Sequence, residues 1–370
     1  MEVMTDDTAL LDRLLNDMVD AEPCYRPTHY WQPYVDRLTR TIREVGVVRF
    51  RALYEPLFMS FGVTHVPDLL VPEFSRSAYR ELTGVKRAVF SVLNRSGVLP
   101  RLVSNHVESH IRTFNAFRDA CFHLAAARDD DGEILRISDS GLGEPRDLFC
   151  PENHEGVQYT LAFLRYFMDY LWVRRVTDFH WLKSVLELGS GYRGQAEVIL
   201  KLYPDVRYVL CDIPPQVYVA EQYLKAVFPG EVSGYLETAA MPEIDLGRTR
   251  RITIMAPWQL EHLVGNVDLF WNSASFQEME PDVVANYAHV IQPHVERYVY
   301  LKQYPGGQVE AARDRDVGVI SKTTREDYKR LFSELTLIRE SDAVQISSES
   351  PRGNPYINSE FYDYMLFERK

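Results

Sequence analysis

The sequence predicts an α/β fold, with a doubly wound sheet of the nucleotide-binding kind and a helical region before it. The first observation is an apolar run at residues 184–188 that ends in a glycine-containing turn and is followed by a helical pattern to Leu202. The second is another apolar run, residues 206–211, that ends at Asp212. The third is that strand and helix patterns continue to alternate up to the C-terminus. Strand, glycine turn, helix, strand and terminal acid occur in this order in the nucleotide-binding half of such a sheet.

The elements after Asp212 are expected from their apolar periodicity. Strand patterns occupy residues 251–256, 267–272, 297–301 and 361–367, and helical patterns occupy residues 215–228, 281–291 and 323–335. The last helix is expected to have Thr323 or Thr324 as its N-cap. The alternation in residues 361–367 is typical of a strand in the edge region of a sheet. About seven strands with helices between them are therefore expected.

We expect two domains, a helical N-terminal domain of residues 1–145 and a sheet domain of residues 146–370. Apolar residues recur at helical spacing from Ala9 to Met18, from Tyr30 to Ile42, from Val85 to Leu93 and in residues 105–127. A further helical pattern, residues 156–175, leads into the first strand. A chain of 370 residues with 46% apolar content is long enough for two cores.

Charge and cysteine content limit the kinds of partner. The formal net charge of −12 argues against nucleic acid, because nucleic-acid binding requires a basic surface. No apolar run reaches the length of a membrane span and no signal peptide opens the chain, so we expect a cytoplasmic protein without a membrane partner. The four scattered cysteines are typical of reduced thiols.

The ligand of the glycine turn can be inferred from charge. Glycine at positions 189 and 191 lets the backbone turn tightly and lets a ligand touch the main chain. Asp212 is placed to accept hydrogen bonds from both hydroxyls of a ribose, which indicates an adenosine-like ligand. Glu187 would repel a pyrophosphate but attract the ammonium and sulfonium of S-adenosylmethionine. Arg193 would favour phosphate, but a long side chain at a helix start can swing to solvent. We therefore expect S-adenosylmethionine as the cofactor.

Three segments carry a resemblance to a known family. They are residues 186–192 (LELGSGY), residues 211–215 (CDIPP) with residues 221–224 (EQYL), and residues 272–279 (NSASFQEM). In these segments the chain resembles class I S-adenosylmethionine-dependent methyltransferases, and in particular the bacterial sugar O-methyltransferases, over residues 140–305. One departure is Arg193, where that family more often has glycine. The resemblance implies a Rossmann-like seven-stranded class I methyltransferase sheet. It also implies methyl transfer to a hydroxyl of a sugar or of a glycosylated small metabolite.

The ligand of such a sheet lies across the carboxyl ends of the strands, which selects the expected site residues. The expected cofactor-binding residues are Glu187, Gly189, Ser190, Gly191, Tyr192, Asp212, Ile213, Trp258, Asn272 and Ser273. Trp258 would flank the adenine or, alternatively, pack under the sheet. Lys302 and Tyr304 follow the fifth strand and are expected to contact the acceptor.

Glu278 is the expected general base, and Gln277 is expected to orient the acceptor. The apolar neighbours Phe276 and Met279 would raise the pKa of Glu278. In the alternative interpretation, Glu278 caps the helix that follows it.

Other interpretations of the sequence, concerning a metal, the acceptor and the function, stay open. His106 and His110 are four residues apart, but no third metal ligand is evident and no pair of strand-end aspartates suggests magnesium, so we expect metal-independent transfer. The acceptor could instead be an aromatic, polyketide or amine scaffold. A nicotinamide-dependent oxidoreductase would share the glycine turn. A scaffold protein without activity is disfavoured, because the acids and glycines of the turn are all present. The N-terminal helices are expected to cover the mouth of the acceptor site or to form a homodimer interface.

Overall fold

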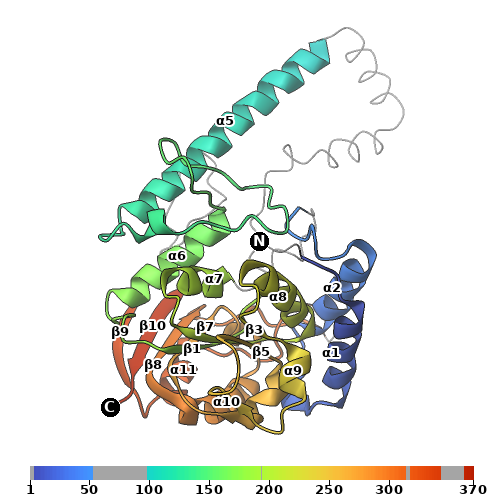
Figure 1. Ribbon diagram of the computed structural model, residues 1–370, viewed down its shortest axis with the longest axis vertical. Coiled ribbons are helices and arrows are strands. Elements are labelled where there is room, and N and C mark those ends of the chain that lie inside the picture. Colours follow the sequence, from blue (N-terminus) through green and yellow to red (C-terminus); the bar gives the residue numbers. More distant parts are fainter. Residues whose placement is uncertain (1–3, 53–97, 193, 314–316, 343–361) are drawn as a thin grey trace.

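An eight-stranded sheet forms the centre of the molecule (Figure 1) in the computed structural model, which describes residues 4–52, 98–192, 194–313, 317–342 and 362–370. The order of the strands is β3-β5-β2-β1-β7-β8-β10-β9. Their bounds are β1 Ser184–Leu188, β2 Arg207–Cys211, β3 Val232–Ser233, β5 Ile252–Met255, β7 Val267–Ser273, β8 Val295–Gln303, β9 Thr336–Asp342 and β10 Asp363–Glu368. All neighbouring strands are parallel, except that β10 runs antiparallel to β8 and β9. The predicted α/β fold is therefore confirmed.

Helices cover both faces of this sheet (Figure 1). Their bounds are α1 Thr8–Asp20, α2 Gln32–Val45, α5 Val98–Ala126, α6 Leu161–Arg174, α7 Gly194–Leu202, α8 Pro214–Val227, α9 Tyr235–Ala239, α10 Pro281–Ile291 and α11 Arg325–Leu331. Helices α6, α7 and α8 lie on one face of the sheet, and α10 and α11 lie on the other. A small second sheet pairs β4 (Ile244–Asp245) with β6 (Leu263–Val264).

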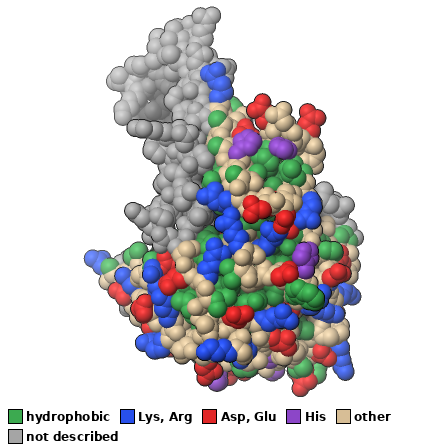
Figure 2. Space-filling model, turned by 90° about the vertical axis from the view of Figure 1, so that its left-hand side faces the viewer, with side chains coloured by type: hydrophobic (Ala, Val, Ile, Leu, Met, Phe, Trp, Pro, Cys, Tyr) green, Lys and Arg blue, Asp and Glu red, His purple; other side chains and the backbone are tan. Residues whose placement is uncertain are grey.

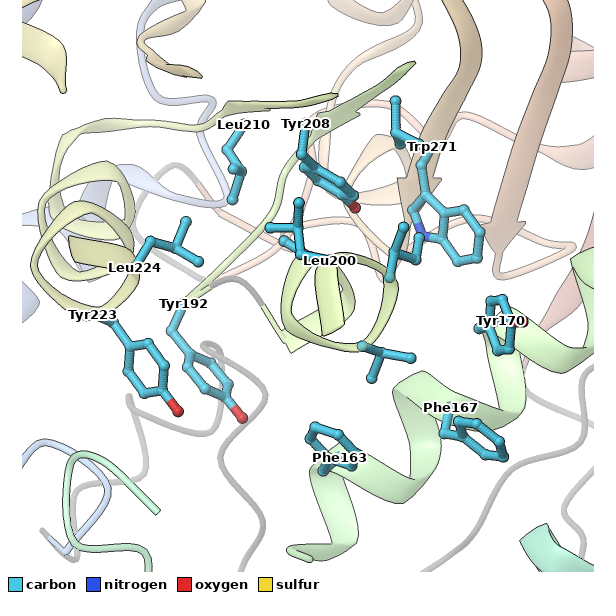
Figure 3. Packing of buried hydrophobic residues seen from close by; sticks show 14 of the residues in the cluster. Phe163, Phe167, Tyr170, Tyr192, Leu200, Tyr208, Leu210, Tyr223, Leu224 and Trp271 are labelled. Atoms are coloured by element: carbon cyan, nitrogen blue, oxygen red, sulfur yellow. The ribbon is translucent and has the colours of Figure 1, made fainter. Parts of the chain in front are cut away.

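The alternation of side chains along the strands builds two cores. On β1, Val185 belongs to the cluster under α6 to α8, whereas Leu186 belongs to the cluster under α10 and α11. Successive side chains of a strand point to opposite faces, so a strand covered on both sides must be apolar throughout. Figure 3 shows part of the first cluster, which includes Phe163, Phe167 and Tyr170 of α6 and Leu200 of α7.

The N-terminal helices pack against the sheet domain. Helices α1 and α2 contact α8, and Leu10 and Leu38 belong to the same core cluster as the helices on that face. Helix α5 contacts α6 and extends away from the body of the molecule (Figure 1). The periodicity of α1 and α2 was expected from the sequence, whereas the pattern from Val85 to Leu93 lies outside the described residues. The division into two domains at residue 145 stays a prediction.

The C-terminal strand is the main correction to the expected fold. The sequence predicts an edge-region strand at residues 361–367, but β10 lies between β8 and β9 and is almost fully buried. The edge is formed by β9, which the sequence analysis did not find. Its residues, TLIRESD, include several charges, and charged side chains are how edge strands avoid pairing with other chains.

The helices predicted at residues 215–228 and 323–335 begin within two residues of the expected starts, whereas the helix predicted at residues 156–175 begins only at Leu161. Thr324 is the N-cap of α11 and exchanges hydrogen bonds with Asp327 in a capping box, so the second of the two expected caps is the correct one. The Thr160 hydroxyl accepts a hydrogen bond from the Phe163 N–H and caps α6. Helix α8 begins at Pro214, one residue before the expected start.

Three further features concern the cysteines, the surface charges and the length of the helices. All four cysteines are free thiols, and Cys121 and Cys211 are buried. On the face shown in Figure 2, Lys and Arg side chains are interspersed with Asp and Glu side chains over the described surface. Within the described parts of the chain, no helix combines the length and the apolar character needed to cross a membrane.

Candidate active site

A cavity of about 260 Å³ lies where the carboxyl ends of β1, β2, β7 and β8 meet. Eight of the twelve residues expected to bind the cofactor or to act in catalysis line it: Glu187, Gly189, Ser190, Gly191, Asp212, Ile213, Ser273 and Glu278. The edge of a doubly wound sheet at which parallel strands end is the usual place for a ligand. A cavity therefore lies where the site is expected from the sequence, and the roles of its residues stay predictions.

The glycine turn after β1 is held tightly in place. Gly189 and Gly191 have φ values of 75° and 56°, in the left-handed region that favours glycine. A Cβ on Gly189 would collide with the side chain of Ser275, so the loop after β7 packs directly on this turn. The N–H of Gly191 donates a hydrogen bond of 2.7 Å to the carboxylate of Asp212 and joins the turn to the end of β2.

Asp212 has the position expected of a ribose-binding acid. Its two carboxylate oxygens accept hydrogen bonds from the N–H groups of Gly191 and Ile213, each at 2.7 Å. Burial raises the pKa of Asp212 to about 7, and these two backbone donors act in the opposite direction. Further donors to the carboxylate, such as ligand hydroxyls, would stabilise its charged form and lower the pKa.

Glu187 places a second acid at the end of β1. Its Oε2 accepts a hydrogen bond of 2.9 Å from the hydroxyl of Tyr208. Tyr208 belongs to the neighbouring strand β2 and is fully buried, so it holds the carboxylate of Glu187 in one place at the cavity wall.

Glu278 is a third acid in the cavity wall, in a short helix (Phe276–Glu278) after β7. Its pKa is raised to about 8, chiefly by burial: a hydrogen bond from the Trp31 indole acts in the opposite direction, and the nearby Asp212 contributes to the rise. The donor, Nε1 of Trp31, lies 3.0 Å from Oε2. The expected upward shift is confirmed. The helix that follows, α10, has Glu280 as its N-cap, so the capping interpretation of Glu278 is wrong.

Two further predicted residues, Asn272 and Gln277, lie behind the cavity wall. Asn272 is fully buried, and its amide donates to the carbonyl of Leu188 at 2.9 Å and to the Ser275 hydroxyl at 2.7 Å. Gln277 is also buried, and its Oε1 accepts a hydrogen bond of 2.6 Å from the N–H of Tyr304. Both side chains fasten the loop after β7 to the neighbouring strand ends, and neither lines the cavity.

The two predicted aromatic residues also point elsewhere. The ring of Tyr192 packs in the core beside Tyr223, at 6.2 Å between centroids (Figure 3), and edge-on against Phe50. The indole of Trp258 donates a hydrogen bond of 3.2 Å to the hydroxyl of Tyr235. Its neighbour Pro257 lines the cavity, but Trp258 does not.

The cavity wall also contains residues from distant parts of the chain, most of which were not expected from the sequence. Trp31 comes from the start of α2, Tyr166 and Asp169 come from α6, and Tyr362 precedes β10. Lys302 also lines the cavity, as expected, and its ammonium group lies 2.8 Å from the carboxylate of Asp169. The predicted acceptor contact Tyr304 is not in the wall.

The described residues contain no group of three His, Cys, Asp or Glu side chains close enough to hold a metal ion. The side chains of His106 and His110, and Arg193 in the glycine turn, lie outside the described residues. Metal-independent transfer therefore stays a prediction.

Comparisons with known proteins identify no family. No family model matches the chain, and a search of curated proteins finds no match. Solved structures do match. The mitomycin 7-O-methyltransferase MmcR is 14% identical, with 54% of this chain and 52% of that chain covered and a TM-score of 0.35. The pyocyanin biosynthetic protein PhzM is 15% identical, with 56% of this chain and 56% of that chain covered and a TM-score of 0.37. The magnesium protoporphyrin IX methyltransferase ChlM of Synechocystis PCC 6803, with bound SAH, is 10% identical, with 54% of this chain and 78% of that chain covered and a TM-score of 0.37.

The chain thus spans about half the length of the first two structures that it matches. At this level of similarity the matches identify neither an acceptor nor a site residue.

Proposed function

We propose that this chain is an S-adenosylmethionine-dependent O-methyltransferase that acts on a hydroxyl of a small molecule. The observation that supports this most is the set of three acids, Glu187, Asp212 and Glu278, around one cavity beside a glycine turn. A pyrophosphate would disfavour the ionised forms of these acids, so they do not suit a nicotinamide dinucleotide. They suit a ligand that carries an ammonium, a sulfonium and two ribose hydroxyls.

Each acid has a separate part in this proposal. Glu187, held by Tyr208, receives the ammonium end of the cofactor. Asp212 accepts hydrogen bonds from the ribose hydroxyls. Glu278, at the end of the cavity that also contains Trp31, faces the acceptor.

When bound, S-adenosylmethionine would supply a methyl group to the acceptor hydroxyl oxygen, and the electron pair of the broken carbon–sulfur bond would stay on sulfur. Glu278 takes the hydroxyl proton in this step. With a pKa of about 8 it is mostly protonated at neutral pH in the ligand-free protein. A bound sulfonium would favour its ionised form, so the base is generated when the methyl donor is present.

For the acceptor we propose a sugar or a glycoside. Aromatic residues (Trp31, Tyr166 and Tyr362) and charged residues (Asp169 and Lys302) all line the cavity. Aromatic faces pack on the apolar faces of sugar rings, and polar side chains bind their hydroxyls. The same aromatic wall favours, as the second candidate, an aromatic or polyketide acceptor. In both cases the N-terminal region contributes a cover, because Trp31 and Thr28 both hydrogen-bond to Glu278.

Calorimetry and mass spectrometry test the proposal. We expect S-adenosylhomocysteine to bind the purified chain and NAD not to bind. Reactions with methyl-labelled cofactor and a panel of nucleotide-sugars, glycosides and phenols should transfer label to a sugar hydroxyl. Binding of NAD without binding of S-adenosylhomocysteine would overturn the cofactor assignment. Label found only on phenols would overturn the sugar assignment.

Size-exclusion chromatography with light scattering checks the expected homodimer. We propose that it forms through the N-terminal helices, and a monomeric mass at micromolar concentration would contradict this.

A further inference from the structure

Gln216 is a buried polar side chain in the cavity wall that the proposed mechanism does not use. It lies in the first turn of α8, directly after the Asp212–Ile213 strand end, and the residue is part of the cavity wall. Only 1% of its surface is exposed. Neither the oxygen nor the nitrogen of its carboxamide has a hydrogen-bond partner among the described residues. A buried amide without partners costs free energy, which a ligand in the cavity would recover.

The backbone around Gln216 has no donors to offer in its place. Helix α8 begins with Pro214 and Pro215, which have no N–H. The next two N–H groups, of Gln216 and Val217, both donate to the carbonyl of Ile213. In this turn of the helix, the side-chain amide of Gln216 is therefore the donor that has no partner within the described residues.

The neighbouring acid indicates which ligand group needs that donor. An ionised carboxylate only accepts hydrogen bonds, so Asp212 can bind the protons of two ribose hydroxyls but leaves the lone pairs of their oxygens without partners. An amide N–H on the same wall can donate a hydrogen bond to one of these oxygens, which the carboxylate cannot do.

We propose that the Nε2 group of Gln216 donates a hydrogen bond to a ribose hydroxyl oxygen of the cofactor, beside Asp212. This inference rests on the proposed function, because it takes the adenosine cofactor as the ligand. It makes Gln216 a cofactor-recognition residue at a position that the strand-end motifs do not include.

Gln195 provides a matched control. It is also 1% exposed, also lies in the first turn of a helix (α7), and both of its amide atoms also lack a partner among the described residues. It does not line the cavity. Replacement by Met keeps the side-chain length and removes the polar atoms at either position.

The test measures S-adenosylhomocysteine affinity by calorimetry for the wild type, Gln216→Met and Gln195→Met. We expect binding to weaken about tenfold in Gln216→Met, the effect of losing one or two neutral hydrogen bonds. Gln195→Met should bind like the wild type. Thermal unfolding without ligand should show neither variant less stable than the wild type, because each loses an unpaired buried amide. If Gln216→Met unfolds, Gln216→Leu takes its place.

Ligand analogues identify the group that Gln216 contacts. The 2′-deoxy and 3′-deoxy forms of S-adenosylhomocysteine lack one hydroxyl each. For one of them, the tenfold difference between wild type and Gln216→Met should disappear, as in a double-mutant cycle. If the difference in affinity disappears instead for S-inosylhomocysteine, Gln216 contacts the base and the ribose assignment is wrong. Equal affinity of wild type and Gln216→Met for S-adenosylhomocysteine overturns the inference. Failure of the wild type to bind it overturns the proposed function.

Discussion

The hydrogen bond between Trp31 and Glu278 allows a direct test of the proposed base. Trp31→Phe removes the indole N–H, which lies 3.0 Å from Oε2 of Glu278, and keeps an aromatic ring in the wall. This donor lowers the pKa of Glu278, whereas burial raises it to about 8. Without the donor, the pKa is expected to rise further.

The size of the effect follows from the strength of the bond. Hydrogen bonds to charged groups contribute roughly 1.5–3 kcal/mol, and one pKa unit corresponds to about 1.4 kcal/mol. Because Trp31 is only half-buried, we expect the lower end of this range, about one unit. A base works only when it is ionised, so raising its pKa removes activity on the acid side. Trp31→Phe should be about tenfold slower below the pKa and similar to the wild type well above it.

The assay is kcat/KM for the acceptor against pH, at saturating cofactor. The ascending limb should move about one unit to higher pH in Trp31→Phe. Trp258→Phe is the control, because this indole also donates a hydrogen bond, to Tyr235, but lies outside the cavity wall. An ascending limb that stays in place in Trp31→Phe would show that Glu278 is not the group that titrates.

Three further outcomes are expected. Glu278→Gln should lower kcat by roughly 10²–10⁴-fold in steady-state assays, with the affinity for S-adenosylhomocysteine, whose sulfur is uncharged, nearly unchanged by calorimetry; a matching loss of that affinity would contradict its role as the base. Arg51→Ala should lower the free energy of unfolding in urea by about 3–5 kcal/mol, because it leaves Asp139 charged and buried without its partner at 2.8 Å. Its control, Arg49→Ala, removes an exposed ion pair and should change stability by less than about 1 kcal/mol; similar losses in both would refute the burial argument. Gly189→Ala should abolish cofactor binding in calorimetry because a Cβ at this φ of 75° meets the loop after β7, and wild-type affinity would show that the turn can relax.

Local patterns predicted most of the described elements, because each depends on short-range chemistry. The proline at the start of α8 and the capping box of α11 are visible within a few residues of sequence. The strands with two covered faces appear as continuous apolar runs. Strand β9 has no such run, since an edge strand with one exposed side tolerates charges such as Arg339 and Glu340. The position of β10 beside it depends on pairing between segments far apart in the chain, which local periodicity does not determine.

Prediction of the site was limited by side-chain direction. The motif segments line the cavity as expected, but Asn272 and Gln277 turn inward and hold loops together, and Tyr192 turns into the core. Neighbouring residues in a turn or at a strand end can point in opposite directions, and only the packing around them decides which way. The backbone placement was therefore predictable and the individual contacts were not.

By itself, the sequence determined the α/β class, the glycine turn and the two acids at the ends of β1 and β2, because these depend on residues next to one another in the chain. The tertiary structure decided what surrounds them. It brought Trp31 to Glu278 and Asp169 to Lys302, and it placed Gln216 without a described partner in the cavity wall. The physical reason is that the pKa of a carboxylate and the solvation of an amide depend on every group within a few ångströms, from whatever part of the chain it comes.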